Sequence, residues 1–137
     1  MSQQHYEWPP KEGFVDMHFL AVSDIARSTR FYTEVLGGSV IRDGAPTLVQ
    51  LANTWLLLDN GGGPTSDKPT VTLAPIKSLD EISSFMNIRV ADVYACYEQW
   101  KARGAQFITE PMEQRLDIRC YMRDPDGYLI EVGQSKL

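Results

Sequence analysis

Two predicted strands carry most of the side chains that could contact a ligand through polar atoms. Arg119 and Tyr121 alternate in one of them, and Asn87 and Arg89 alternate in the other. Because alternate residues of a strand point to the same face, each pair would present its polar groups together. The chemistry open to them is hydrogen bonding and charge pairing with a small molecule. The alternative is that both arginines are ordinary surface residues.

The usual ligands of transition metals are scarce in this chain. It has two histidines, His5 and His18, and two cysteines, Cys96 and Cys120, with neither a CxxC nor an HExxH spacing. Two cysteines cannot form a disulfide framework, and we interpret both as small hydrophobic residues of the interior rather than as reactive thiols. His5 lies in a polar N-terminal segment and is not expected to act in its own chain's site.

Asp124 and Asp126 place two carboxylates close together in the segment DPDG. Every residue type in this segment is one that tight turns favour. We therefore interpret the pair as part of a structural turn rather than as a site.

The composition excludes some classes of partner. The formal net charge is −5 and the pI about 4.9, which argues against nucleic acid, since binding to phosphates depends on Lys and Arg. No leader opens the chain, and no apolar run approaches the roughly 18 residues of a membrane span. We expect a cytoplasmic protein without a membrane or nucleic-acid partner.

The chain contains the same unit twice. VSDI at 22–25 returns as VADV at 90–93, 68 residues later, and the aromatic residues Tyr32 and Trp100 share that offset. An apolar strand pattern precedes each copy and a helical pattern follows its Asp. Two copies of one supersecondary unit are therefore expected, and they tend to enclose a cleft between them.

Each unit is predicted to run strand, helix and three strands. The first has strands at 14–22, 39–42, 47–52 and 55–58 and a helix from Asp24 to about residue 36. The second has strands at 85–90, 106–108, 118–122 and 128–133 and a helix from Asp92 to about residue 103. A glycine-rich connection at 59–69 and an extra strand at 70–74 lie between the units.

Two segments resemble the signature of the vicinal oxygen chelate superfamily, which holds glyoxalases, bleomycin-resistance proteins and extradiol dioxygenases. They are VSDIARSTRFYTEVLGG at 22–38 and RDPDGYLIEVGQ at 123–134. The resemblance implies an α+β fold of two tandem βαβββ modules, forming a cleft between curved mixed sheets. The expected organisation is an N-terminal arm at 1–13 and a single domain at 14–137. In that domain, module one is about 14–58, a linker with the extra strand is 59–81, and module two is about 82–134.

The resemblance also implies where a metal would be held. Its ligand positions correspond to Met17 and Phe85 on the first strands, and to Leu57 (or Leu56, one register apart) and Glu131 on the last strands. Only Glu131 could be a ligand, and one carboxylate cannot hold a divalent ion that needs four to six donors. No metal cofactor is therefore expected.

His18 lies one residue from a ligand position, and in a strand one residue means the opposite face. We expect His18, Leu20 and Val22 to face the helix side, with Met17 and Phe19 on the cleft side. His18 is interpreted as a structural residue. A displaced ligand or base is the alternative, and with Glu131 it would be the fallback for a metal.

Glu131 is the one candidate for catalysis. Beside Met17, Leu57 and Phe85 its carboxylate would lie in low-dielectric surroundings and could act as a general base. The alternative is that Glu131 pairs with a neighbouring arginine, Arg89 or Arg119. Trp55 is either a core residue or a stacking surface at the cleft mouth. The expected lining of the cleft is Met17, Phe19, Trp55, Leu57, Phe85, Asn87, Arg89, Arg119 and Tyr121.

These residues leave two classes of function open. The favoured one is a metal-independent protein that binds a small organic molecule in an apolar cleft, as in the bleomycin-resistance branch. The other is a lyase, isomerase or dioxygenase of the glyoxalase type, either metal-free with Glu131 as base or metal-dependent.

We also expect a homodimer. The family resemblance implies pairing of modules between chains, and the apolar segment 55–58 is expected at a sheet edge, where unpaired backbone groups would favour a partner. The proline-bearing arm, with Tyr6 and Trp8, is suited to lie across a second copy.

Overall fold

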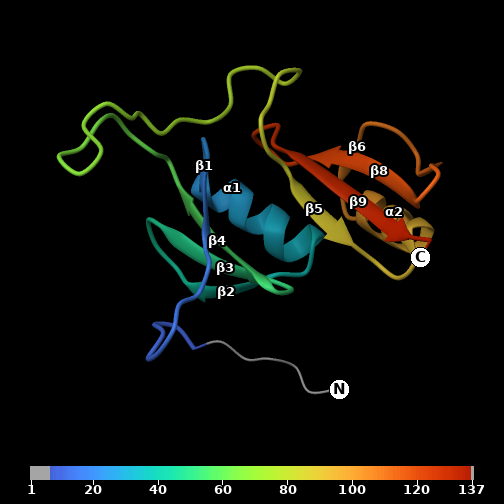
Figure 1. The fold of residues 1–137 in the computed structure, drawn as a ribbon, viewed down its shortest axis with the longest axis horizontal. Helices are drawn as coiled ribbons and strands as arrows, with labels where there is room; N and C mark the ends of the chain where they lie inside the picture. The colour runs from blue at the N-terminus through green and yellow to red at the C-terminus, as the bar shows by residue number, and fades with distance from the viewer. Residues whose placement is uncertain (1–6, 137) are drawn as a thin grey trace.

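The computed structural model describes residues 7–136 and contains two mixed sheets of the same design (Figure 1). Module one comprises β1 (His18–Ala21), α1 (Ile25–Arg30), the π-helical turn η1 (Phe31–Val35), β2 (Ser39–Arg42), β3 (Thr47–Leu51) and β4 (Thr54–Asp59). Module two comprises β5 (Met86–Arg89), α2 (Val93–Ala102), β6 (Gln106–Phe107), β7 (Met112–Glu113), β8 (Asp117–Arg123) and β9 (Leu129–Ser135).

The strand order confirms the predicted duplication and the fold class. Module one is ordered β1-β4-β3-β2 and module two β5-β9-β8-β6, with β7 added beside β8. The first strand of each module pairs in parallel with the last, His18 opposite Leu56 and Met86 opposite Ile130. Each helix begins at the predicted aspartate: Asp24 accepts from the backbone N–H of residue 27 at 3.1 Å, and Asp92 from that of residue 95 at 3.0 Å.

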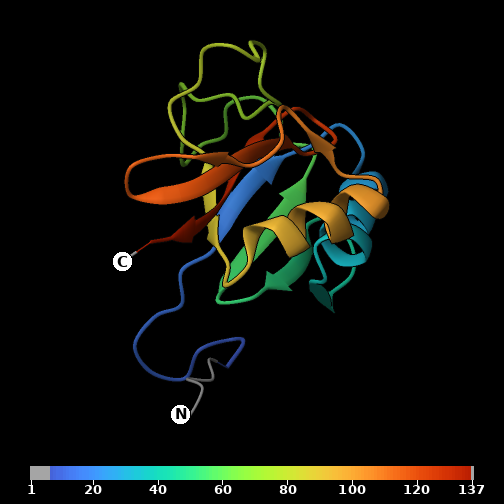
Figure 2. The same ribbon diagram turned by 90° about the vertical axis from the view of Figure 1, so that its right-hand side faces the viewer.

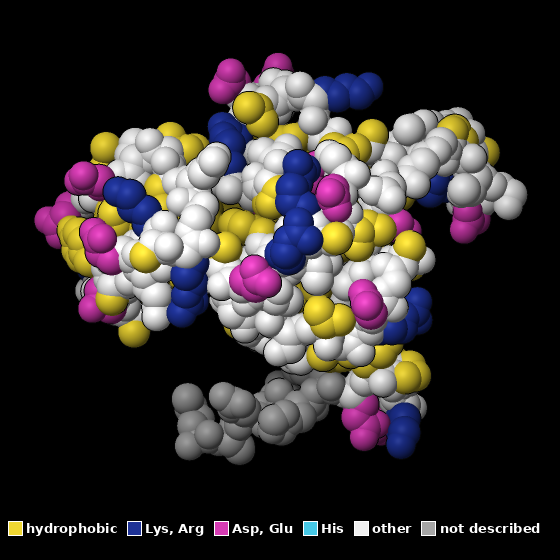
Figure 3. Space-filling model, turned by 180° about the vertical axis from the view of Figure 1, so that it is seen from behind, with side chains coloured by type: hydrophobic (Ala, Val, Ile, Leu, Met, Phe, Trp, Pro, Cys, Tyr) yellow, Lys and Arg dark blue, Asp and Glu magenta, His cyan; other side chains and the backbone are white. Residues whose placement is uncertain are grey.

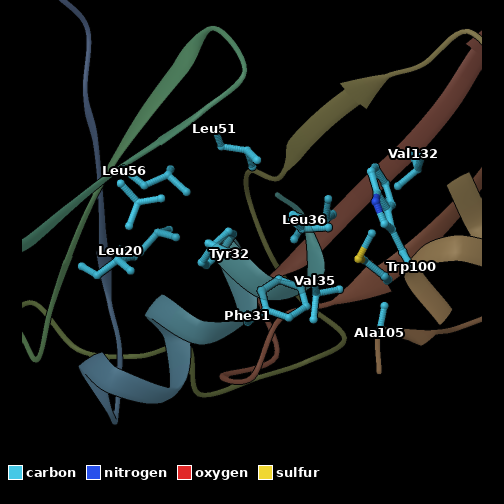
Figure 4. Packing of buried hydrophobic residues seen from close by; sticks show 14 of the residues in the cluster. Leu20, Phe31, Tyr32, Val35, Leu36, Leu51, Leu56, Trp100, Ala105 and Val132 are labelled. Carbon is cyan, nitrogen blue, oxygen red and sulfur yellow. The ribbon is translucent and has the colours of Figure 1, made fainter. Parts of the chain in front are cut away.

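Both helices cover the same side of the sheets, which leaves the opposite side as a separate outer face (Figure 2). The alternation along the strands explains this arrangement. Leu20, Leu56, Ile130 and Val132 belong to one buried cluster with residues of both helices, as predicted for Leu20. In Figure 4, Leu20 and Leu56 lie to one side of Tyr32, whose ring fills the space between the first sheet and the rest of the core. The outer face therefore carries the intervening residues of each strand.

The DPDG turn joins the two modules, a role that the sequence did not reveal. Its Asp124 accepts a buried hydrogen bond of 2.8 Å from the Tyr32 hydroxyl of module one. Asp126 accepts a bond from the Ser23 backbone N–H at 2.9 Å, and the Tyr128 hydroxyl donates to the Ala21 carbonyl at 2.7 Å. Carboxylates placed at the start of α1 also suit the partial positive charge of a helix N-terminus.

Four expectations about the elements need correction. The first strand begins at His18 rather than at residue 14, because Phe14 is 84% exposed and packs on no sheet. The segment 70–74 is not a strand, since only Leu73 forms an isolated bridge, to Gly62. The segment 55–58 is not at an edge, because β4 lies between β1 and β3. β7 was not expected.

The surface charges are mixed. Seen from behind, basic and acidic side chains lie among apolar ones without a large area of one sign (Figure 3). Within residues 7–136, no helix combines the length and the apolar character needed to cross a membrane.

Candidate functional site

On the outer face of module two, Glu131 is the centre of a polar network. Its side chain is buried, the residue being 6% exposed, and it lies on β9 between Asn87 of β5 and Tyr121 of β8. The Tyr121 hydroxyl donates to Glu131 Oε1 at 2.6 Å, and Arg89 Nη1 donates to Oε2 at 2.9 Å. Both carboxylate oxygens therefore already have donors within the chain.

Arg89 extends this network along the sheet. Its Nη2 donates to Asp117 Oδ2 and to Ser135 Oγ, each at 3.2 Å. The guanidinium lies over Gly133, where a Cβ would collide with it, so the missing side chain makes room for the arginine. A planar guanidinium with five N–H groups suits such a set of acceptors better than any other side chain.

Arg119 completes the network on its far side. Its Nη1 approaches Asp117 Oδ1 at 3.4 Å, so the group contains two arginines and two carboxylates whose charges balance. The structure thus brings together the four polar residues that the sequence placed in the cleft, Asn87, Arg89, Arg119 and Tyr121, with Asn87 contacting Arg89 Nη1 at 3.4 Å. They are joined to one another rather than left free.

The apolar surroundings expected for Glu131 are replaced by polar ones. The outer-face neighbours on β5 and β8 are Asn87 and Tyr121. Phe85, one of the apolar residues expected beside Glu131, packs edge-on against the Tyr121 ring, with ring centroids 6.0 Å apart. The other interpretation was that Glu131 pairs with a neighbouring arginine, and the structure contains this pair, with Arg89 Nη1 at 2.9 Å from Glu131 Oε2.

The outer face of module one carries several apolar side chains, with Gln50 opposite Trp55. Phe19 and Leu57 lie opposite each other in the β1–β4 pair and are half-buried. Trp55, on the same face of β4, is only 5% exposed because Trp8 of the N-terminal arm packs edge-on against it, with ring centroids 5.9 Å apart. Met17 comes directly before β1 and is also half-buried. Trp55 is therefore a buried residue covered by the chain's own arm; Tyr6 and His5 lie outside the described residues.

A cavity of about 310 Å³ lies between the modules, along the facing strands β1 and β5. Its floor is formed by Leu20, Leu56 and Ile130. Four aromatic residues belong to the lining: Phe19, Phe85 and Tyr128, which have exposed surface, and Tyr32, which is fully buried. The structure therefore brings Phe19 and Phe85 together in one cavity, whereas the polar candidates of module two do not line it.

His18 is found on the helix side of its strand, as predicted, but it is exposed at this cavity rather than packed in the core. Asp16, Thr54 and Ser84 lie with it in the lining. Neither Asp16 nor Ser84 belongs to a sequence motif, so neither could be selected as a site residue from the sequence.

The donor set does not fit the metal that the family resemblance implies. The register places Leu57 and Glu131 at equivalent positions, opposite Phe19 and Asn87 on the first strands. Leucine at one of these positions supplies no ligand atom, and Glu131 at the other is bonded to Arg89 and Tyr121. Within residues 7–136, no three His, Cys, Asp or Glu side chains gather as a metal site would need.

Three tyrosines with raised pKa values should make stability sensitive to alkaline pH. Burial and the nearby Asp124 raise the pKa of Tyr32 well above its usual value, the hydrogen bond to Glu131 raises the pKa of Tyr121, and burial raises that of Tyr128. An unfolded tyrosine ionises near pH 10, so their contribution is complete below about pH 10 and is lost as the pH rises further. Urea unfolding between about pH 8 and 11 should show this loss. A Tyr32→Phe variant should lose less stability over the same pH range. If the free energy of unfolding falls with pH as steeply as in the wild type, Tyr32 does not contribute to this pH dependence.

Both thiols should be unreactive in the folded protein. Burial raises the pKa of Cys120 to about 11 and also raises that of Cys96. Since the thiolate is the reacting form, a disulfide reagent at neutral pH should modify the folded protein at least about tenfold more slowly than the urea-unfolded protein. Rapid modification of one thiol per folded chain would show that a cysteine is active, against this interpretation.

Comparison with known proteins places this architecture in a family. The model of the Glyoxalase/Bleomycin resistance protein/Dioxygenase superfamily matches residues 14–132. A probable lactoylglutathione lyase of Vibrio parahaemolyticus is 30% identical over 124 residues, which cover 85% of this chain and 87% of that protein. A lactoylglutathione lyase of Arabidopsis thaliana is 29% identical over 136 residues, covering 93% of this chain. The chain spans only 47% of that plant protein.

Solved structures share the fold. A glyoxalase-related enzyme from Fulvimarina pelagi has a TM-score of 0.68 and 21% identity, covering 88% of this chain and 87% of its own. An antibiotic binding protein from Streptomyces sp. CB03234 has a TM-score of 0.64 and 22% identity, covering 92% of this chain and 98% of its own. At these identities the likeness concerns the fold alone.

Proposed function

The chain belongs to the glyoxalase/bleomycin resistance protein/dioxygenase superfamily, and within it we propose a metal-independent protein that binds a small organic molecule. The observation that carries the proposal is the state of Glu131. The one carboxylate left at the ligand positions has a guanidinium and a phenol as partners, at 2.9 and 2.6 Å. A positively charged side chain of the same chain thus supplies the charge that a metal ion would supply.

The residues at the other ligand positions support the same proposal. Met17, Leu57 and Phe85 offer apolar surface to a guest, and ligand pockets are mostly lined by apolar and aromatic side chains with few polar groups. One neighbour in fold is described as an antibiotic binding protein. We further propose that the protein acts in the cytoplasm and as a homodimer, for which the exposed apolar side chains of the edge strand β2, Val40 and Ile41, are suitable contacts.

A binding screen in the presence of EDTA tests the proposal. Purified protein is mixed with a panel of small aromatic and aliphatic molecules, and hits from thermal shift are measured by calorimetry. The expected result is saturable one-to-one binding of at least one class, unchanged by EDTA. Affinity that disappears with EDTA and returns with zinc or nickel would overturn the proposal.

The sequence relatives favour a second candidate, lactoylglutathione lyase activity. It can be assayed directly on the purified chain with and without added zinc or nickel. We expect no turnover above the uncatalysed rate, because the donor set lacks the ligands for a Lewis-acid metal. Turnover that requires metal and is lost in Glu131→Gln would favour the enzyme.

A further inference from the structure

We propose that the cavity between β1 and β5 binds an aromatic molecule carrying a positive charge, such as an aryl amine in its ammonium form. The inference rests on the proposed function and deepens it, by assigning the guest to a place and a chemical class. This cavity is separate from the Glu131 network, because its lining takes Leu56 and Ile130 from the helix-side faces of β4 and β9.

The size and walls of the cavity suit an aromatic guest. A volume of about 310 Å³ is at the lower end of the range, roughly 300–1,000 Å³, found for small-molecule sites. Phe19, Phe85 and Tyr128 offer aromatic surface in its lining, and aromatic pairs gain from offset or edge-on contacts beyond the burial of area.

The hydroxyl groups of the two tyrosines have no free proton to donate to the guest. The Tyr32 hydroxyl donates to Asp124 at 2.8 Å and the Tyr128 hydroxyl donates to the Ala21 carbonyl at 2.7 Å. Both protons are used in bonds that hold the two modules together, and Tyr32 is fully buried, so the aromatic rings with surface open to a guest are those of Phe19, Phe85 and Tyr128. Such rings attract a cation through their negative faces.

The charge at the lining points the same way. Asp16 is its one acidic residue, and no Lys or Arg of residues 7–136 belongs to the lining. A cation would therefore meet a carboxylate and aromatic faces, whereas an anion would meet the same carboxylate, with the His18 imidazole as the one basic side chain of the lining. This asymmetry predicts discrimination between guests of equal size and opposite charge.

Three probes of nearly equal shape test the proposal: 1-naphthylmethylamine, 1-naphthylmethanol and 1-naphthoic acid. Calorimetry at neutral pH with EDTA should show saturable binding in the order amine, alcohol, acid, with the acid at least tenfold weaker than the amine. Asp16→Asn should bring the amine and alcohol closer together, and Glu34→Gln, an exposed acid outside the lining, should leave the order unchanged. Equal affinity for amine and acid would overturn the assignment of charge.

Two adjacent serines offer a matched pair for locating the site. Ser84 belongs to the lining and Ser83 does not, and both are exposed, so tryptophan at either position should leave the fold intact. Ser84→Trp should weaken binding of the amine at least tenfold, and Ser83→Trp should leave it within about twofold. Equal effects of the two, with the wild type still binding the amine in EDTA, would overturn this site but leave the proposed function standing. Absence of binding by all three probes would overturn the site, while the wider screen in EDTA decides the function independently.

Discussion

Replacing Arg89 by alanine should destabilise the protein by about 2–3 kcal/mol, because it leaves the buried Glu131 without its positive partner and Asp117 with Arg119 alone. The expected cost is at the low end for a buried pair, since the Arg89 side chain is 38% exposed and solvent screens part of the interaction. Urea unfolding at neutral pH measures the effect. Arg115→Ala, which removes an exposed arginine, should cost less than about 0.5 kcal/mol.

A second pair of variants tests the geometry of the same contact. Gly133→Ala adds a side chain where the Arg89 guanidinium lies, so it should displace the arginine and destabilise the protein by about 1–3 kcal/mol. In the Arg89→Ala background the added methyl group has no guanidinium to displace, and Gly133→Ala should then be nearly neutral. Additive costs of the two substitutions would contradict the contact between the Arg89 guanidinium and Gly133.

Replacing Asp124 by alanine should have the largest effect at the junction of the two modules. Asp124 accepts from the Tyr32 hydroxyl at 2.8 Å and from the backbone N–H groups of residues 126 and 128 at 2.9 Å each. The alanine leaves these three donors without their acceptor. Because solvent or neighbouring groups replace only part of the lost hydrogen bonding, we expect a total loss of about 2–4 kcal/mol of stability.

A double-mutant cycle separates the buried bond from the turn. The cycle combines Asp124→Ala with Tyr32→Phe, and the coupling energy should be about 1–2 kcal/mol, as for a hydrogen bond to a charged group. Coupling near zero would mean that Asp124 stabilises only its own turn and does not join the modules. Burial raises the pKa of Asp124, so ionisation of this carboxyl lowers the stability of the folded state as the pH rises from the usual aspartate pKa, about 4, through the raised one.

Local patterns predicted the parts of the fold that depend on neighbouring residues. The period of two along β1 assigned His18 and Leu20 to the helix side, and Asp24 and Asp92 marked both helix starts. Pairing of Glu131 with Arg89 was one of two interpretations open from the sequence. Each of these inferences needs only the side-chain alternation of a strand or the geometry of a helix cap.

The remaining features depend on contacts between distant residues. β4 is central because β1 pairs with it in parallel, a pairing that no local pattern specifies. Asp117 lies one residue outside the predicted strand 118–122, so its place beside Arg89 was not expected. Trp8 covers Trp55 across 47 residues of sequence. Gly133, within the last strand, was the one sequence feature that pointed to the position of the Arg89 guanidinium, since glycine inside a strand often marks a close approach of another group.

Calorimetric titration of the metal-stripped protein with zinc and with nickel tests the central claim most directly. If Arg89 supplies the positive charge beside Glu131 and the other ligand positions are apolar, neither ion should bind with one-to-one stoichiometry in the micromolar range. The Glu131→Ala and His18→Ala variants should give the same titration as the wild type. Binding of one ion per chain that is lost in Glu131→Ala would show that this carboxylate is a metal ligand, and would contradict a metal-independent site.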